Sequence, residues 1–395
     1  MRILIHDYAG YPFPVQLSRH LAQLGHQVLH LYAAYNITPR GLLTRQPGDF
    51  PNLNIKGIFI KKPVQKYFFV IRWFQELEYG RHLEKEIELF RPDVVISANT
   101  PLDAQAFGVR KSKEMNVKFI FWLQDITGYA TYLKLRKIIP GFGHAVGKYY
   151  IQLEKSLLKN SDHIVTISND FMPILGEMGL FEDRISIIQN WAPLDEVKPS
   201  QNDNPWAGLH GFNKNFIFLF TGILEIKHNP ALLILLANSF RDIKDVTVFV
   251  VSESKGAVWL KRQKRERDLH NLYILNYQPL EVMSDILGYG DVIVAIFGTD
   301  AGIYSVPYKI LTYICSLRPL LLSVPPESLV ARIVKENKLG VVVPPGQDER
   351  FIEAAHELYE NSSLRYRYAQ NARRYAEQNF DIKKIAVKFL KIFQD

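Results

Sequence analysis

The sequence predicts an α/β protein built from two doubly wound domains, and three observations support this prediction. Short apolar runs alternate along the whole chain with segments that have helical spacing, which is typical of parallel sheets covered by helices. The length of 395 residues suits two domains. A polar stretch at 193–215, rich in Pro, Asn, Asp and Gly, separates two halves that both open with a strand, a loop and a helix.

The first half opens with a predicted strand at 2–5, a loop at 6–14 and a helix at 15–24, which Gly25 ends. That loop lacks the Gly-x-Gly-x-x-Gly pattern, so it does not indicate a dinucleotide site. Further elements of this half are expected as strands at 28–32, 55–60, 94–98, 118–123, 163–167 and 185–188, and as helices at 150–158 and 171–178.

The second half repeats this architecture without repeating the sequence. Its predicted strands are 216–220, 246–251, 273–275, 292–297, 320–324 and 340–343, and its predicted helices are 230–240, 281–287, 310–317, 350–359, 364–379 and 382–393. We place the domains at 1–195 and 196–380, facing each other across a cleft. The C-terminal helix, within 381–395, is expected to pack back on the first domain.

Composition narrows the class of protein. Apolar residues make up 47% and charged residues 22% of the chain, which is ordinary for a soluble protein. The single cysteine, Cys315, cannot form an internal disulfide, which fits a cytoplasmic setting. The chain opens on a strand instead of a signal peptide, and its apolar windows are too short to span a bilayer. The formal charge of +8 favours phosphates or an acidic membrane surface, and no nucleic-acid motif accompanies it.

The stretch 299–309 is predicted to bind an anion, because it follows an apolar strand and leads into a helix. Gly302 lets the backbone approach a ligand closely, Ser305 can cap the helix, and Pro307 suits its first turn. Backbone N–H groups and the helix dipole at such a helix start attract phosphate groups. We therefore expect a diphosphate here; the alternative is an ordinary capped turn.

Two lysines accompany this stretch. Lys309 lies in the first turn of the helix, where its charge opposes the dipole, so an anionic partner is favoured over simple solvation. Lys227 lies in the first loop of the second half, where it could neutralise a departing diphosphate, although a solvated lysine is the alternative. Tyr277 and Glu281 could line a pocket for a nucleotide base, with a purely structural role as the favoured alternative.

In the first half, polar residues follow two predicted strands. Asn99 and Thr100 follow the strand at 94–98, and Asp125 follows the strand at 118–123. Ligands of open α/β sheets gather at these carboxyl ends, so we expect a functional role for Asp125, with loop capping as the alternative.

Two basic segments of the first half point to further contacts. Residues 61–74 interleave lysine and arginine with aromatic residues, which favours a membrane interface; a helix with its aromatic side chains in the core is the alternative. A second basic segment, 134–148, is expected to be mobile and to contact an acceptor.

Several chemistries lack their motifs. The chain has no Asp-x-Asp, no close-set group of metal-ligating residues, no Walker-type phosphate loop and no Gly-x-Ser-x-Gly elbow. Cys315 has no evident catalytic partner. We therefore predict no metal site and no cofactor.

Taken together, these residues resemble the retaining glycosyltransferases of family 4, which have the GT-B fold of two Rossmann-like domains. The resemblance covers nearly the whole chain, and its motifs are 10–14, 162–168, 188–191, 222–230, 290–292 and 305–319. It implies a nucleotide-diphospho-sugar donor held by the second domain and an acceptor held by the first. Roles implied by the resemblance fall on the donor-binding residues Gly222, Lys227, Glu253, Tyr277, Gly302, Ser305, Val306, Lys309 and Thr312, on the acceptor-binding residues Gly10, Tyr11, Asn99 and Thr100, and on Asp125 and Lys227 as catalytic residues.

The chain also departs from the family pattern. Tyr304 and Thr312 stand where the family usually carries two glutamates, and Ile223 stands where an arginine is common. Either Lys227 or His228 can match the family's lysine. The Val-Pro-x-Lys motif is similar to that of a sub-group of polysaccharide-assembly enzymes.

The resemblance implies transfer of a sugar from a nucleotide-diphospho-sugar to an acceptor hydroxyl with retention, without a metal, in polysaccharide or glycolipid assembly. The protein would work in the cytoplasm or peripherally at the inner face of a membrane. Two alternatives are a nucleotide-sugar epimerase of the same fold, with Glu253 and Asp125 as acid and base, and a non-catalytic partner subunit.

Overall fold

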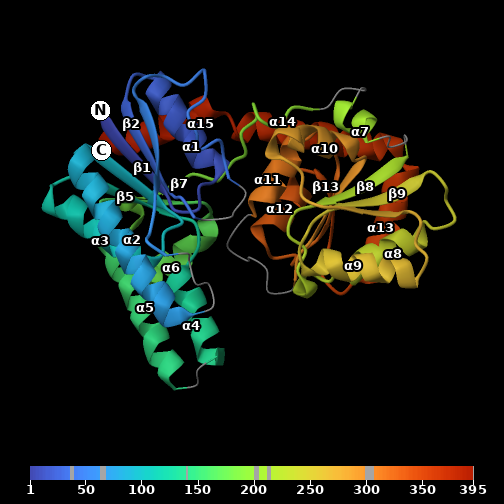
Figure 1. Cartoon of the computed structure of the whole chain (residues 1–395), viewed down its shortest axis with the longest axis horizontal. Helices are drawn as coiled ribbons and strands as arrows, with labels where there is room; N and C mark the ends of the chain where they lie inside the picture. The colour runs from blue at the N-terminus through green and yellow to red at the C-terminus, as the bar shows by residue number, and fades with distance from the viewer. Residues whose placement is uncertain are drawn as a thin grey trace. The chain divides into compact units, whose positions relative to one another are not determined.

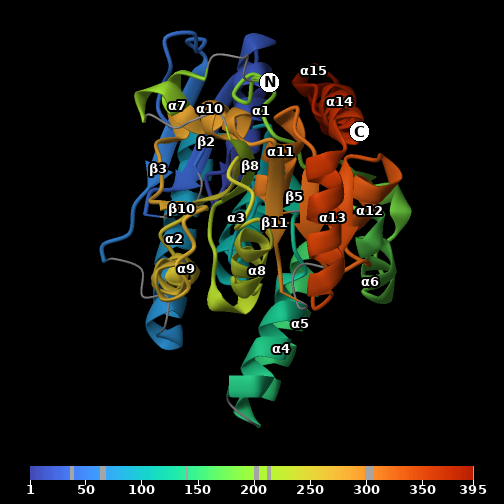
Figure 2. The same cartoon turned by 90° about the vertical axis from the view of Figure 1, so that its right-hand side faces the viewer.

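A computed structural model describes the chain except for residues 36–39, 63–67, 139–140, 200–203, 211–214, 299–306 and 395. The described residues form two compact units, 1–189 with 382–395, and 190–381. Each unit contains one parallel sheet with helices packed around it, as Figures 1 and 2 show. The predicted fold class, two doubly wound α/β domains, is confirmed. The first unit ends at Gln189, whereas we placed the domain boundary at residue 195. It also includes the C-terminal segment 382–395.

The sheet of the first unit has seven strands in the order β3-β2-β1-β4-β5-β6-β7. The strands are β1 Arg2–Asp7, β2 Gln27–Ala33, β3 Leu53–Ile58, β4 Val94–Ala98, β5 Lys118–Leu123, β6 His163–Thr166 and β7 Ile185–Ile187. The helices are α1 Pro12–Gln23, α2 Phe69–Phe90, α3 Leu102–Glu114, α4 Thr127–Ile138, α5 Phe142–Lys159, α6 Met172–Glu177 and α15 Ile382–Gln394, with 3₁₀ turns η1 Asn169–Phe171 and η2 Glu182–Arg184.

The sheet of the second unit has six strands in the order β10-β9-β8-β11-β12-β13. The strands are β8 Phe216–Thr221, β9 Val246–Val251, β10 Leu272–Leu275, β11 Val292–Ile296, β12 Leu320–Ser323 and β13 Gly340–Val343. The helices are α7 Pro205–Leu209, α8 Ala231–Ser239, α9 Lys255–Glu266, α10 Met283–Tyr289, α11 Tyr308–Cys315, α12 Leu329–Glu336, α13 Asp348–Glu360 and α14 Ser362–Asn379, with 3₁₀ turns η3 Ile226–His228 and η4 Leu280–Val282.

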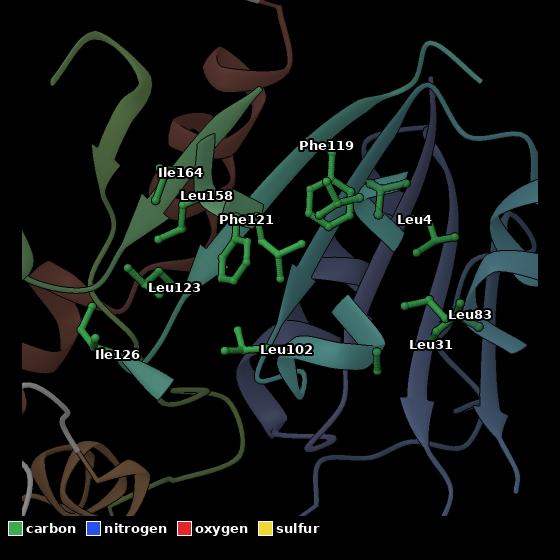
Figure 3. Close-up of a cluster of buried hydrophobic side chains, with 14 of the residues drawn as sticks. Leu4, Leu31, Leu83, Leu102, Phe119, Phe121, Leu123, Ile126, Leu158 and Ile164 are labelled. Carbon is green, nitrogen blue, oxygen red and sulfur yellow. The ribbon is translucent and has the colours of Figure 1, made fainter. Parts of the chain in front are cut away.

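The inner strands of each sheet, such as β4, β8, β9 and β11, are buried on both faces, which is why they read as apolar runs, whereas the edge strands β3, β7, β10 and β13 are partly exposed. In the first unit, Phe119, Phe121 and Leu123 of β5 extend from one face of the sheet into a cluster with side chains of the covering helices (Figure 3). Helix α15 packs against α1 of the same unit, and its Phe389 ring lies 5.0 Å from the ring of Trp122 on β5. Burial of these apolar surfaces is the main stabilising term of the unit.

Three predictions about the elements need correction. Helix α1 begins at Pro12 instead of residue 15, because prolines are tolerated in a first turn whose N–H groups have no helical partner. The basic segment 134–148, predicted to be mobile, is helical in α4 and α5 on either side of 139–140. The polar stretch 193–215 contains α7, where Trp206 is buried against Phe249 of β9.

Candidate functional site

The carboxyl ends of β8, β9 and β11 bring the predicted donor-binding residues of the second unit to one edge of its sheet. All three strands run parallel, so the loops that follow them emerge at the same edge. Gly222, directly after β8, has φ +100 and donates its N–H to the Val251 carbonyl oxygen at 3.0 Å. A side chain at Gly222 would be strained at this φ, and its Cβ would lie 3.7 Å from Cδ of Lys309.

Lys309 is the most unusual charge at this edge. It is the second residue of α11, and its Nζ lies 4.8 Å from the ring centroid of Phe220 and 4.6 Å from that of Phe297. Two aromatic faces stabilise an ammonium group, but they replace less of its lost hydration than a carboxylate would. Burial lowers the pKa of Lys309 to about 8, and no negative charge of the described residues offsets this shift. The lysine is therefore placed to gain from an anionic ligand.

In the loop after β8, Lys227 and His228 have different environments. The Nδ1 atom of His228 accepts a hydrogen bond from the Glu225 backbone N–H at 3.2 Å, as part of a capping box around η3. Burial, and then the charges of Lys309 and Lys227, lower the pKa of His228. The side chain of Lys227 is exposed. His228 thus holds the loop as a neutral imidazole, and Lys227 is the cation that the loop presents.

Glu253 and Tyr277 lie side by side after β9 and β10. The Glu253 carboxylate accepts a hydrogen bond from the Tyr277 backbone N–H at 3.1 Å, and burial raises the pKa of the Tyr277 phenol. Nearby, the Ser254 hydroxyl accepts from the Leu224 N–H at 2.7 Å and donates to the Leu224 carbonyl oxygen at 2.8 Å. These bonds fix the loops after β8, β9 and β10 to one another.

Of the predicted donor-binding residues in and directly before α11, only Lys309 and Thr312 lie among the described residues. Thr312 is buried, and its hydroxyl donates to the Tyr308 carbonyl oxygen at 3.3 Å within the helix. The predicted residues Gly302, Ser305 and Val306, and Tyr304 beside them, lie outside the described residues. Tyr313, which the sequence did not single out, donates its hydroxyl to the Thr221 carbonyl oxygen at 2.7 Å and anchors α11 to β8.

In the first unit, the loop after β1 is organised by Asp7, a residue that sequence reasoning missed as a functional candidate. Its carboxylate accepts hydrogen bonds from the Tyr11 N–H at 2.6 Å and from the Asn99 side-chain amide at 2.8 Å. Burial raises the pKa of Asp7 to about 6, although these hydrogen bonds act to lower it. Gly10 at φ +76 and Asn99 at φ +54 have left-handed backbones that shape the two loops. The available signal was the position of Asp7 at the carboxyl end of the first strand, β1.

A buried network lies directly beneath these loops. His6 has one ring nitrogen 2.7 Å from the Ser97 hydroxyl and the other 2.8 Å from the Tyr79 hydroxyl, and burial lowers its pKa to about 3. Ser97 also donates to Gln105 Oε1 at 2.7 Å, and Thr100 donates to the Ala98 carbonyl oxygen at 2.9 Å. Thr100, predicted to bind an acceptor, is mostly buried in this neutral network.

Asp125 is exposed two residues after the end of β5, at the same edge as Tyr11. Burial, then the charges of Asp7 and Asp125, raise the pKa of Tyr11 to about 12. Glu154, a buried residue of α5 that sequence reasoning missed, accepts hydrogen bonds from the N–H groups of Thr127 and Gly128 at 2.8 and 3.0 Å. It thereby holds the start of α4 just behind Asp125, and burial, above all, raises its pKa to about 7.

Two features are absent from the described part of the chain. Within it, no group of three or more His, Cys, Asp or Glu side chains could hold a metal ion. Also within it, no helix has both the length and the apolar composition that crossing a bilayer requires.

Two family models match the chain. Residues 14–196 match Glycosyltransferase Family 4, and residues 207–375 match Glycosyl transferases group 1. The chain therefore belongs to the glycosyltransferases that carry these two domains, as the resemblance predicted. A search of curated protein sequences found no significant match.

Solved structures with the same fold include several glycosyltransferases. HepE from Anabaena, solved with UDP, has 14% identity and a TM-score of 0.71, with 100% of each chain covered. Sucrose-phosphate synthase from Thermosynechococcus elongatus has 13% identity and a TM-score of 0.71, covering 100% of this chain and 98% of its own. WaaG, a glycosyltransferase involved in lipopolysaccharide biosynthesis, has 15% identity and a TM-score of 0.68, covering 100% and 99%. The chain has the GT-B fold of these proteins.

Proposed function

We propose that this glycosyltransferase moves a sugar from a nucleotide-diphospho-sugar to an acceptor hydroxyl with retention at the anomeric carbon. The observation that carries the proposal is Lys309, a partly buried cation held between Phe220 and Phe297 with no compensating charge from the described residues. A diphosphate would supply the missing negative charge. The HepE structure, which has the same fold, was solved with UDP.

In the proposed reaction, the bond between the anomeric carbon and the donor phosphate oxygen breaks as the acceptor oxygen bonds to the same face of that carbon. The acceptor hydroxyl gives its proton to the departing phosphate oxygen, so the products are a glycoside and a nucleoside diphosphate. Lys309 and Lys227 would stabilise the leaving charge electrostatically. No metal and no cofactor takes part in this scheme.

The remaining donor contacts are proposed around these lysines. Gly222 leaves space beside Lys309, while the linked loops of Glu253 and Tyr277 would receive the nucleotide. Because the Thr312 hydroxyl bonds within its own helix, we assign it a packing role beside the ribose. Gly302, Ser305 and Val306 would add backbone N–H groups to the diphosphate.

The acceptor is proposed to bind the first unit. The loop that Asp7 holds presents Gly10 and Tyr11, and Asn99 lies against it. Asp125 would orient the sugar or the acceptor hydroxyl from the end of β5. We propose a saccharide or lipid-linked acceptor of polysaccharide or glycolipid assembly, handled in the cytoplasm, where the enzyme associates with the inner face of an anionic membrane.

The test is a thermal-shift panel of nucleoside diphosphates and their sugar conjugates. A ligand that binds only the folded protein raises its apparent stability, by about 2.7 kcal/mol at a hundredfold excess over Kd. We expect at least one nucleoside diphosphate to raise Tm and nucleosides without phosphate to leave it unchanged. If no diphosphate shifts Tm, the non-catalytic alternative replaces the proposal.

To test the epimerase alternative, the protein is incubated, in the absence of any acceptor, with the nucleotide-sugar that it binds. The proposal predicts that the sugar keeps its configuration. Interconversion of the donor sugar would instead assign the chain to the epimerases.

A further inference from the structure

The first turns of α2 expose apolar side chains that a folded monomer normally buries. The exposed fractions are 62% for Phe68, 45% for Phe69, 64% for Val70, 48% for Ile71 and 59% for Phe74. These positions point around the helix rather than along one face, so they cannot all pack against the unit. The alternative of aromatic side chains in the core therefore does not hold for them. Contiguous apolar surface of this kind marks an interaction site.

A helical hairpin, α4 with α5, continues this exposed surface. Its helices pack closely because Gly143 and Gly147 lie at their contact, where a Cβ at Gly147 would come within 2.7 Å of Tyr132 Cα. Figure 1 shows the hairpin projecting from the first unit beyond the end of its sheet. It exposes 69% of Phe142 and 54% of Tyr149. The hairpin is thus a closely packed arm with aromatic side chains on its surface.

The two parts belong to one surface. The ring of Phe69 lies 6.5 Å from that of Tyr150, which in turn lies 5.3 Å from the ring of Tyr149. In Figure 1 the start of α2 lies beside the hairpin at the same end of the unit. We call the start of α2, residues 68–74, together with the hairpin, residues 127–138 and 141–159, the arm surface.

The arm surface is strongly positive. Between 127 and 159 the sequence has six basic residues, Lys134, Arg136, Lys137, Lys148, Lys155 and Lys159, against one acidic residue, Glu154. Glu154 is buried and holds the start of α4, so it does not oppose these charges at the surface. Lys134, Lys137 and Lys148 are exposed.

We propose that the arm surface docks the first unit on an anionic lipid bilayer. Exposed aromatic side chains partition into the boundary between headgroups and acyl chains, and nearby lysines are attracted to anionic headgroups. A protein partner would instead favour a surface with fewer lysines. The docking would bring the acceptor-binding loops close to lipid-linked substrates. Only this consequence of the docking rests on the proposed function.

The experiment is flotation of the full chain with vesicles of phosphatidylcholine alone and with about one third phosphatidylglycerol added. We expect binding to the anionic vesicles only, weakening as salt is raised because surface charges are screened. The charge variant Lys134→Glu/Lys137→Glu/Lys148→Glu should weaken binding at least about a hundredfold, since each lysine contributes about fivefold. The variant Phe69→Ser/Phe142→Ser should also lose binding.

Matched controls separate the arm surface from general effects. Phe181→Ser removes an equally exposed phenylalanine of the same unit, 72% exposed, and Lys85→Glu reverses an exposed lysine farther along α2. Both controls should bind vesicles like the unchanged protein, and thermal unfolding should show every variant to be folded.

Equal binding to neutral vesicles, equal loss in the controls, or no binding at all would overturn the proposal. A dimer that Phe69→Ser/Phe142→Ser dissociates would assign the surface to a second copy of the chain instead. Vesicle binding needs no donor or acceptor, so it can fail while the thermal-shift panel succeeds, and the reverse.

Discussion

The two units present the same kind of sheet edge with opposite chemistry. At the edge of the first unit, Asp7 and His6 are buried, and hydrogen bonds to the backbone and neighbouring side chains satisfy them. At the edge of the second unit, Lys227 is exposed, and the Lys309 ammonium lies beside the rings of Phe220 and Phe297 with no offsetting negative charge among the described residues.

The difference suits the two edges to different kinds of ligand. A network whose polar groups are already paired holds loops in place and can recognise neutral hydroxyl groups without strong charge. A desolvated cation gains most from an anion, because the ligand restores the interaction that burial removed. This contrast supports our proposal that the diphosphate binds the second unit.

The largest expected effect comes from removing the charge of Lys309. The Lys309→Met variant keeps an unbranched side chain between the aromatic rings but cannot stabilise a leaving diphosphate. We expect kcat/KM to fall about a hundredfold or more, about 3 kcal/mol, which is typical of a lost electrostatic contact in a water-poor site. Steady-state kinetics with the donor found in the thermal-shift panel measures this.

Two checks belong to this prediction. Lys335→Met, at an exposed lysine of α12, should leave kcat/KM unchanged. In the unchanged protein, Lys309 loses its proton as the pH rises through about 8, so the affinity for nucleoside diphosphate should fall above that pH. If Lys309→Met follows the same pH curve, Lys309 is not the titrating group.

The next largest effect is expected at the other edge, where Asp7 holds a loop instead of a ligand. The Asp7→Ala variant leaves the Tyr11 N–H and the Asn99 amide without their acceptor. Each unsatisfied buried donor costs about 1–3 kcal/mol, and because both donors here are only partly buried we expect the low end for each, a fall in the free energy of unfolding of about 2 kcal/mol. Urea unfolding with both variant and unchanged protein measures the difference.

The pH dependence of stability sharpens this test. Because the folded state raises the pKa of Asp7 from 3.8 to about 6, Asp7 stabilises the protein at low pH and loses that contribution as the pH rises through about 6. Asp7→Asn should flatten this part of the curve. Asp93→Ala, at an exposed carboxylate that accepts from the Arg2 N–H, should cost less than Asp7→Ala.

The smallest effect is expected from Lys227→Ala. Its side chain is exposed, so water and salt screen its charge, and we expect Kd for nucleoside diphosphate to rise only about two- to fivefold. Calorimetry at low and high salt should show the difference shrinking as salt is added. If Lys227→Ala weakens diphosphate binding as much as Lys309→Met does, the exposed lysine contributes as much as the partly buried one, and the predicted ranking of the two lysines is wrong.

Much of the fold was predictable because its signals are local. Most strands are apolar runs, such as 246–251, and helical spacing identified α11 and α14. The errors arose where tertiary packing overrides local signals. Trp206 makes α7 an ordered part of a polar stretch, and glycines 143 and 147 serve helix contact instead of mobility.

The places of the candidate residues in the fold were predictable from the sequence, but their contacts were not. The order of elements alone predicted that Asn99 and Asp125 follow strands of the first sheet and that Lys309 lies in the first turn of the helix after β11. The roles of these residues in binding stay predictions. The pairing of Asp7 with Asn99, and the two rings beside Lys309, depend on side chains from different strands meeting in space. Such long-range contacts cannot be inferred from neighbouring residues in the sequence. Glu154 is the clearest case, since its hydrogen-bond partners lie 26 and 27 residues away.

The return of α15 to the first unit has a consequence for how the protein is made. Residues 190–381 form one unit while the first still lacks the side chains of Ile385, Phe389 and Phe393 that complete its packing. During synthesis the second unit can close on itself as soon as it leaves the ribosome, whereas the first must wait for the last helix. Until then, the apolar side chains of α1 and β5 that α15 covers, Trp122 among them, lack their packing partner.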